Sequence, residues 1–299
     1  MSTRTFLSAL RPLIDRRFWM LIVSLLLASG SSAIAAENEK GDAPEFLRVK
    51  NNADGKPTAL QTAIAHYQSK KDGAKLQVDL IGAVHIGEGS YYEELNKRFK
   101  DYDAVMYELV APEGTRVPAG GAGHSSPVSG LQNGIKDMLA LEFQLEKVDY
   151  SPENFIHADM SPDEFAKDME ERGDSILGMF ARAMGQGLVQ QSQGGSTDAA
   201  LMMALFSSNR EKKLRRVFAS QIADMDNQMK AIEGENGSTI ISQRNAKAFE
   251  VMDREIKNGK QKIAVFYGAG HLDDMHKRLL KDFGMELKKV EYLDAWELE

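Results

Sequence analysis

The stretch LQVDLIGAVHIGE, residues 76–88, carries the most informative pattern in this chain. It begins with a short apolar run that ends at Ile81 and has the length and composition of a buried β-strand. Gly82 follows, and His85 comes three residues after that glycine. Glycine allows a sharp turn or the close approach of another chain segment. Because ligands bind at the carboxyl ends of strands in a parallel α/β sheet, we predict that this strand presents His85 at a ligand site.

A second copy of this pattern lies near the end of the chain. The apolar run 262–267 is followed by Gly268 and, three residues later, by His271. Each copy precedes a helical pattern and then another strand pattern. We therefore predict an α/β fold with a mixed sheet, built from two related strand-GxxH-helix-strand halves with a large helical insertion, about 131–258, between them.

The remaining elements follow from hydrophobic periodicity and from turn and capping residues. We expect strands at 58–67, 75–84, 103–110, 262–267 and 285–296, and helices at 89–100 and 271–283. Residues 111–130 are rich in glycine, proline and serine and predict a long loop, which contains His124. Within the insertion we expect helices at 131–146, 161–172, 175–190, 197–207, 210–232 and 238–257, a capping box at Ser161 and an optional short strand at 155–157.

The amino terminus has the three parts of an export signal. Four arginines among the first 17 residues precede an apolar segment at 18–28 and small residues at 31–36. We predict a signal peptide at 1–36, a flexible lead-in at 37–57 and a single α/β domain at 58–299. The protein is then exported, to the periplasm or the medium, with no stable membrane insertion once the signal is cleaved. An uncleaved N-terminal membrane anchor is the alternative.

Composition limits the chemistry and the partners. The 299 residues include no cysteine, which excludes disulfides, thiolate metal sites and a cysteine nucleophile. The formal net charge is −7, and removal of residues 1–36, with four Arg and one Asp, lowers it to −7 − 3 = −10. This acidity argues against a nucleic-acid partner, because phosphates bind to basic surfaces.

The two histidines and one glutamate form a candidate metal site. Neutral imidazole is the commonest metal ligand of proteins, and two histidines with one carboxylate are a familiar catalytic set. Glu108 lies in the otherwise apolar strand pattern 104–110, where a carboxylate is costly unless it is paired or binds a cation. We expect its strand to neighbour that of His85. We predict His85, Glu108 and His271 as ligands; the alternative for Glu108 is a strand-end carboxylate that reaches solvent.

Two further residues are candidates for catalysis. Glu88 follows His85 by three residues and suits a further ligand, a general base, or simply an acidic residue in the first turn of a helix. Arg244 lies at the edge of an apolar helix face and suits binding of a substrate carboxylate or an oxyanion. The alternative for Arg244 is a partly buried arginine with an ion-pair partner. For His66 we expect a structural or surface role.

These residues together resemble the TraB/PrgY/GumN family, which is related to the Tiki metalloproteases and more distantly to erythromycin esterases and ChaN-like haem-binding proteins. The resemblance spans about 58–296 and rests on an ordered set of short motifs, which are Gly82-Ala83-Val84-His85, Met106-Tyr107-Glu108-Leu109, Gln243-Arg244-Asn245 and Gly268-Ala269-Gly270-His271. It implies a mixed α/β fold with a helical insertion. It also implies a divalent metal of the Mn, Co or Zn type held by His85, Glu108 and His271, with Arg244 close by, and peptide hydrolysis or capture.

Three functional hypotheses follow. The first is an exported metal-dependent hydrolase that acts on peptides. The second is a non-catalytic protein that sequesters a peptide or small ligand on helices rich in methionine, since methionine surfaces adapt to many ligands. The alternative is that these methionines fill the core between the helices. The methionines are Met179, Met184, Met202, Met203, Met225 and Met229. The third is haem or metal storage, which the lack of an evident axial-ligand pocket disfavours.

Overall fold

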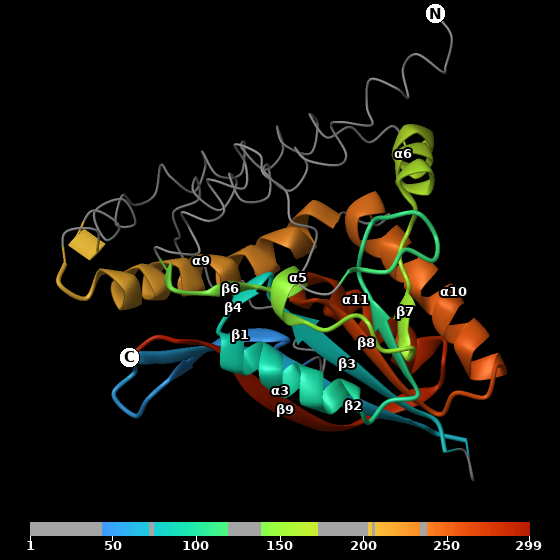
Figure 1. The fold of residues 1–299 in the computed structure, drawn as a ribbon, viewed down its shortest axis with the longest axis horizontal. Coiled ribbons are helices and arrows are strands. Elements are labelled where there is room, and N and C mark those ends of the chain that lie inside the picture. Colours follow the sequence, from blue (N-terminus) through green and yellow to red (C-terminus); the bar gives the residue numbers. More distant parts are fainter. Residues whose placement is uncertain (1–43, 72–74, 119–138, 173–202, 205–206, 234–237) are drawn as a thin grey trace, which may run out of the picture.

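The computed structural model describes residues 44–71, 75–118, 139–172, 203–204, 207–233 and 238–299. Its centre is a twisted sheet with helices on both faces (Figure 1). The sheet has seven strands, which are β1 (Leu47–Asn51), β2 (Pro57–Ser69), β3 (Gln77–Ala83), β5 (Ala104–Tyr107), β7 (Phe155–His157), β8 (Lys262–Gly268) and β9 (Met285–Glu297). The predicted α/β class is confirmed.

The sheet combines a parallel and an antiparallel part. Strands β3, β8, β5 and β7 are consecutive neighbours and run parallel, which places β8 between β3 and β5. The long strand β2 is antiparallel to β1, β3 and β9; it pairs with β9 along one side and with β1 and then β3 along the other. The sheet is therefore mixed, as predicted, and its parallel half has all its carboxyl ends on one edge.

One boundary of the sequence prediction is wrong. We expect residues 37–57 to be a flexible lead-in, but the described part of this segment contains β1, which pairs with β2 from Leu47↔Thr62 onward. Phe46, just before β1, is buried and its carbonyl accepts a hydrogen bond from the Ala63 N–H at 2.9 Å. Charged residues outnumber apolar ones here, so the local composition hid a strand whose stability comes from its partner.

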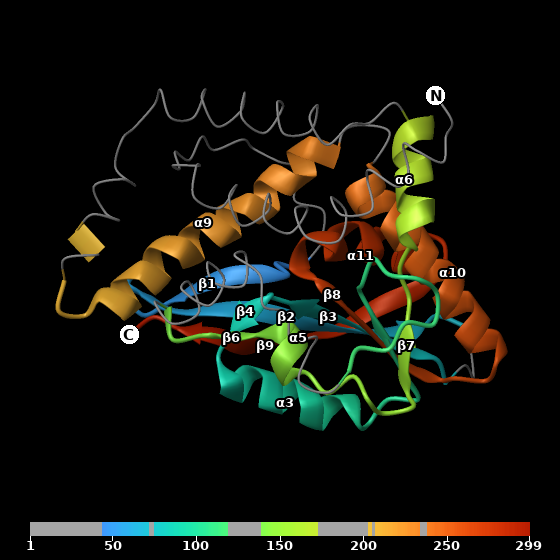
Figure 2. The same cartoon turned by 45° about the horizontal axis from the view of Figure 1, so that its top comes forward.

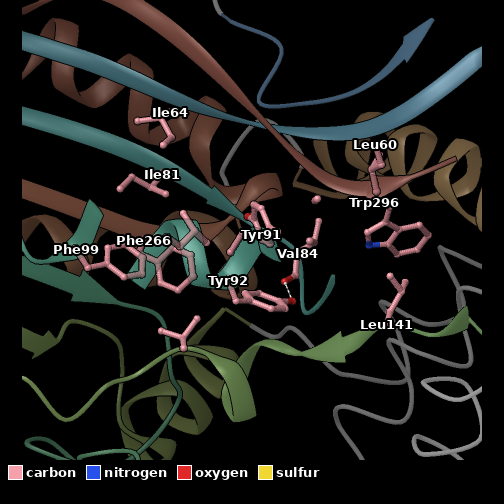
Figure 3. Packing of buried hydrophobic residues seen from close by; sticks show 14 of the residues in the cluster. Leu60, Ile64, Ile81, Val84, Tyr91, Tyr92, Phe99, Leu141, Phe266 and Trp296 are labelled. Carbon is pink, nitrogen blue, oxygen red and sulfur yellow. Dashed lines mark hydrogen bonds between the residues drawn. The ribbon is translucent and has the colours of Figure 1, made fainter. Parts of the chain in front are cut away.

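Helices cover the two faces of the sheet (Figure 2). Helix α3 (Gly89–Phe99) packs on one face, whereas α10 (Arg244–Lys257) and α11 (Leu272–Lys281) pack on the other. Strand β8 serves both cores, since Ala264 and Phe266 face α3 while Ile263 and Val265 face the other helices. Phe99 and Phe266 meet edge to face with ring centroids 4.9 Å apart (Figure 3).

The two Gly-x-x-His units are related but not identical. Strand β8 leads through a short 3-10 helix (Ala269–His271) directly into α11. After β3, by contrast, the chain passes His85 and forms β4 (Ile86–Gly87), which pairs with β6 (Glu142–Phe143), before α3 begins. His271 therefore lies at the head of a helix, whereas His85 lies in a connection between two strands.

The described part of the insertion is mostly helical, but it also contributes to the sheet. Helices α6 (Pro162–Glu171) and α9 (Arg210–Glu233), and the π-helix Thr239–Gln243 that leads into α10, confirm three predicted helices. The capping box at Ser161 is confirmed, and the optional strand is β7. Residues 142–147 form β6 and the short helix α5 (Gln144–Lys147), so the helix expected at 131–146 is wrong there. The prediction at 175–190 falls outside the described residues.

No helix in the described ranges has both the length and the apolar character needed to span a membrane.

Candidate functional site

Four polar residues gather at the carboxyl edge of the parallel strands. His85 follows β3, Glu108 follows β5, Asp159 follows β7, and His271 follows β8. The strands end nearly level, since Ala83 pairs with Gly268 and Tyr107 pairs with both Phe266 and His157. The expectation that Glu108 and His85 come from neighbouring strands is wrong, because β8 lies between them. The result favours a shared site, since His271 then comes from the middle strand.

Both glycines of the Gly-x-x-His units are needed for close packing. A Cβ on Gly82 would lie 3.3 Å from the carbonyl oxygens of Phe46 and Ala63. A Cβ on Gly268 would lie 3.2 Å from Glu108 Oε2. Neither glycine has a positive φ, so the structural reason for both is lack of space rather than a sharp turn.

Glu108 is an almost fully buried carboxylate with a cation and a backbone donor. Its Oε1 accepts a hydrogen bond from Arg244 Nη2 at 2.6 Å, and its Oε2 accepts one from the Gly268 N–H at 2.8 Å. Burial by itself would raise the pKa of Glu108. The charge of Arg244, the charges that His271 and His85 acquire when they are protonated at low pH, and the Gly268 N–H outweigh burial and hold the pKa well below its usual range. Glu108 is therefore ionised.

Arg244 is held between two carboxylates. Its Nε and Nη2 donate to the two oxygens of Asp159 at 3.0 and 2.6 Å, which is a fork-like pairing, and Nη2 also donates to Glu108. Burial would lower the pKa of Arg244, but Glu108 and Asp159 outweigh it and raise the pKa. The arrangement matches the ion-paired alternative for Arg244, since the charge that a substrate carboxylate would use is already balanced.

Asp159 is a residue of the site that the sequence patterns did not predict. It lies two residues after the edge strand β7 and is 3% exposed. Like Glu108, Asp159 is a carboxylate close to the end of a strand. The strand before Asp159, however, is only three residues long, Phe155–His157. So short a strand is hard to recognise from periodicity alone.

The π-helix before α10 leads into two successive residues, Arg244 and Asn245, whose side chains contact the site. Ser238 caps it, and its hydroxyl accepts from the Ile241 N–H at 3.2 Å. Arg244 and Asn245 then begin α10 and are both buried, at 5% and 0% exposure. Arg244 turns to Glu108 and Asp159, while Asn245 turns to His271. Irregular turns of this type occur often at functional sites.

His271 is buried and neutral. Desolvation lowers its pKa to about 4, although Glu108 acts in the opposite direction. Its Nδ1 lies 2.7 Å from Asn245 Oδ1. Since an amide oxygen only accepts, Nδ1 carries the ring proton and Nε2 carries a lone pair. Nε2 lies 3.5 Å from Glu108 Oε1. Two acceptors therefore face each other inside the protein.

His85 is the most exposed of the three predicted ligands. The residue is exposed, and its carbonyl oxygen accepts from the Gln144 N–H at 2.9 Å. Desolvation lowers the pKa of the ring, and the charge of Glu108 and a side-chain interaction with Gln144 oppose that change. His85 also lowers the pKa of His271. The three predicted ligands thus interact electrostatically. As they stand, the described residues contain no group of three or more His, Asp or Glu close enough to hold a metal.

Glu88 takes part in a different set of contacts. Its Oε1 accepts from Arg215 Nη1 at 2.7 Å and from the Glu297 N–H at 3.0 Å. Arg215 also donates to the carbonyls of Leu139 and Ala140, at 2.7 and 2.9 Å. Arg215, which the sequence analysis did not single out, therefore joins α9, β9 and the start of α3. The contacts of Glu88 among the described residues are structural.

Of the remaining residues that the sequence suggested, His66 and Met203 are described, whereas His124 and the other named methionines are not. His66 pairs with the buried Asp79, Nδ1 to Oδ2 at 2.9 Å, in agreement with its expected structural role. His124 lies outside the described residues, as do the side chains of Met179, Met184, Met202, Met225 and Met229. Met203 is described and 74% exposed. A comparison of the chain with models of known families, with characterised proteins and with solved structures finds no match.

Proposed function

We propose that this protein is an exported metal-dependent hydrolase of the TraB/Tiki type that acts on peptides, with His85, Glu108 and His271 as metal ligands. The observation that carries the proposal is the pair of facing acceptors, His271 Nε2 and Glu108 Oε1, 3.5 Å apart and with side chains only 8% and 10% exposed. Two acceptors in a buried site repel each other unless a positive species lies between them.

Two of the three proposed donor atoms have the separation expected of ligands of one divalent ion. Nitrogen and oxygen ligands of a tetrahedral ion, with bonds of about 2.0–2.2 Å, lie roughly 3.3–3.6 Å from each other. The separation of 3.5 Å between Nε2 and Oε1 falls in this range. Neutral imidazole and carboxylate are also the ligands that Zn, Mn and Co accept. His85, on the exposed side, would supply the third ligand.

The charge of the site also favours a cation. Glu108 and Asp159 are two carboxylates, and Arg244 is the only positive side chain that donates a hydrogen bond to either of them within the part of the chain that the structure describes. With both histidines neutral, these three side chains carry a net charge of −1. A divalent ion would change this net charge from −1 to +1, whereas a substrate carboxylate alone would lower it to −2 and increase the repulsion.

The chain's own residues would have distinct roles. When bound, a divalent ion supplies Lewis acidity and lowers the pKa of a coordinated water. Arg244 and the Gly268 N–H hold Glu108 in place, and Asn245 holds His271. His85 lies where a substrate would approach from solvent. Glu88 has no catalytic role in this proposal, because its Oε1 is already bonded to Arg215 and to the Glu297 N–H.

Metal analysis and peptide cleavage test the proposal together. We expect about one equivalent of Zn²⁺, Mn²⁺ or Co²⁺ in the purified protein, and loss of metal in His271→Ala and His85→Ala. His66→Ala, whose ring pairs with Asp79 away from the site, is the matched control. A peptide library incubated with and without Mn²⁺ or Co²⁺ reports cleavage. Metal binding without cleavage of any peptide would indicate the sequestering protein instead, and no metal binding would reject both the ligand set and the hydrolase.

The export part of the proposal has its own test. Removal of residues 1–36 would leave Glu37 as the first residue. N-terminal sequencing of the protein recovered from the cell envelope or the medium measures this directly. Recovery of the intact chain from the membrane fraction would instead establish the uncleaved anchor.

A further inference from the structure

Asn245 lies at the centre of a chain of hydrogen bonds that ends at His271. Its Nδ2 donates to the His271 carbonyl at 3.0 Å and to Asp274 Oδ2 at 2.9 Å. Its Oδ1 faces His271 Nδ1 at 2.7 Å. Asn245 thus holds both the ring and the main chain of the same histidine, and its own side chain is completely buried.

The orientation of the Asn245 amide is determined by its partners. The carbonyl of His271 and the carboxylate of Asp274 are both acceptors, so the NH₂ group must face them and the amide oxygen must face the ring. Asp274 in turn is held by Arg278, whose Nε donates to Oδ2 at 2.7 Å. Arg278 Nη2 donates to the Ser242 carbonyl at 3.1 Å, which ties α11 to the π-helix turn before Asn245.

We infer that Asn245 is a positioning residue that keeps His271 in the Nδ1–H tautomer, so that the lone pair of Nε2 points at Glu108. The opposite tautomer would place a proton on Nε2, which would donate to Glu108 Oε1 and close the space between the two side chains. Asn245 prevents this closure because its Oδ1 requires a donor at Nδ1. The inference rests on the proposed function in that a lone pair on Nε2 is what a metal ligand needs.

The tautomer can be observed directly in the metal-free protein. Long-range ¹H–¹⁵N correlation spectra distinguish Nδ1–H from Nε2–H imidazole rings. The full chain has six histidines, and His271→Ala identifies the signals of His271 by their loss. We expect the wild-type ring as the Nδ1–H tautomer. An Nε2–H ring in the wild-type protein would overturn the inference without any further variant.

Three variants separate positioning from general stability. Asn245→Ala removes the acceptor at Nδ1, so we expect a mixture of tautomers and roughly 10- to 100-fold weaker Zn²⁺ binding. Asn245→Asp keeps an acceptor at Nδ1 but removes the NH₂ donor from the His271 carbonyl and Asp274, so we expect it to lose stability while Nδ1 still carries a proton. Asn258→Ala, at the exposed carboxyl end of the same helix, is the control and should match the wild type.

The outcomes distinguish this inference from the proposed function. An unchanged tautomer in Asn245→Ala would overturn the inference even if Zn²⁺ still binds. An Asn245→Asp ring without a proton on Nδ1 would also overturn it, and the tautomer of the wild-type ring decides the matter if the variants fail to fold. A wild-type protein with the Nδ1–H tautomer and no affinity for Zn²⁺ or Mn²⁺ would reject the metal-dependent hydrolase while confirming the role of Asn245.

Discussion

Arg244 donates through one nitrogen, Nη2, to Glu108 Oε1 and to Asp159 Oδ2, both at 2.6 Å. The two carboxylates come from different parallel strands, β5 and β7, and Arg244 comes from the helix α10 that covers one face of the sheet. This shared cation allows two buried negative charges to lie at one edge of the sheet. It also leaves Glu108 with a defined orientation toward His271.

Replacement of Arg244 by methionine should destabilise the protein strongly. Glu108 and Asp159 would then be buried without a cation, and removal of one partner of a buried ion pair costs roughly 3–5 kcal/mol. Arg244→Lys should restore only part of the lost unfolding free energy, because an ammonium group cannot reproduce the paired hydrogen bonds of the guanidinium with Asp159. Urea denaturation at pH 7 measures the free energy of unfolding. Lys257→Met removes an exposed ion pair on the same helix and should cost less than about 1 kcal/mol. Equal effects of the two methionine variants would contradict the assignment.

Replacement of Gly268 by alanine should disturb the site more than the fold. The new Cβ would lie 3.2 Å from Glu108 Oε2, so the carboxylate must move away from the Gly268 N–H. We expect about 10-fold or greater loss of Zn²⁺ affinity, by analogy with other groups that orient metal ligands. Gly89→Ala is the matched control, because nothing lies within 4 Å of a Cβ at that position. Titration calorimetry measures both, and similar affinities would argue against a ligand role for Glu108.

Replacement of Glu88 by glutamine tests the catalytic role that the sequence suggested. The variant keeps the size of the side chain but weakens its bond to Arg215, so we expect a loss of roughly 1–2 kcal/mol in unfolding free energy. The rate of peptide cleavage should change by less than a few-fold. A 100-fold loss of cleavage without loss of stability would establish Glu88 as a general base after all.

The stability of the metal-free protein should fall as the pH is lowered below about 6.5. Burial lowers the pKa of His271 to about 4 in the folded chain, whereas the ring in the unfolded chain titrates near 6.5. The unfolded state therefore binds more protons between these values, and unfolding becomes easier by up to roughly 3 kcal/mol. The folded pKa of Glu108 is lowered, so its contribution to stability is lost only when the pH falls below its unfolded pKa near 4.5. The loss of stability between about pH 6.5 and pH 4.5 therefore reports His271.

Denaturation curves of the wild type and of His271→Gln between pH 7 and pH 4.5 measure this effect. The free energy of unfolding of the variant should depend less steeply on pH. Some pH dependence should remain because desolvation also lowers the pKa of His85. Parallel curves for the two proteins would show that His271 is not kept neutral by burial.

Local patterns were sufficient for most elements and for three of the residues at the site. The apolar runs of β3 and β8, each followed by Gly-x-x-His, located two of these residues, and an unexpected carboxylate after β5 located the third. The capping box at Ser161 marked the start of α6 correctly. These features depend on interactions within a few residues, which a single sequence displays directly.

Long-range pairing was not available from the sequence. Asp159 follows a strand of only three residues, and β1 shows its apolar and charged alternation over only four residues, Leu47 to Lys50. Arg215 resembles any other arginine on an amphipathic helix, yet it is buried and joins α9 to the last strand. The partners of Asp159 and Arg215 lie far away in the chain, so periodicity contains no information about them, whereas β1 pairs with the next strand and was simply too short to recognise.

The amino-acid sequence by itself determined the α/β class and the two Gly-x-x-His units, and it proposed candidate ligands, because strand and helix periods, glycines and the chemistry of side chains are local properties. The tertiary structure alone decided that β8 lies between β3 and β5, which brings His271 to 3.5 Å from Glu108. It alone gave Arg244 two carboxylate partners and His271 its amide partner. Strand order and buried charge pairing arise from packing of the whole chain, which sets the neighbours of each side chain and hence its charge and tautomer.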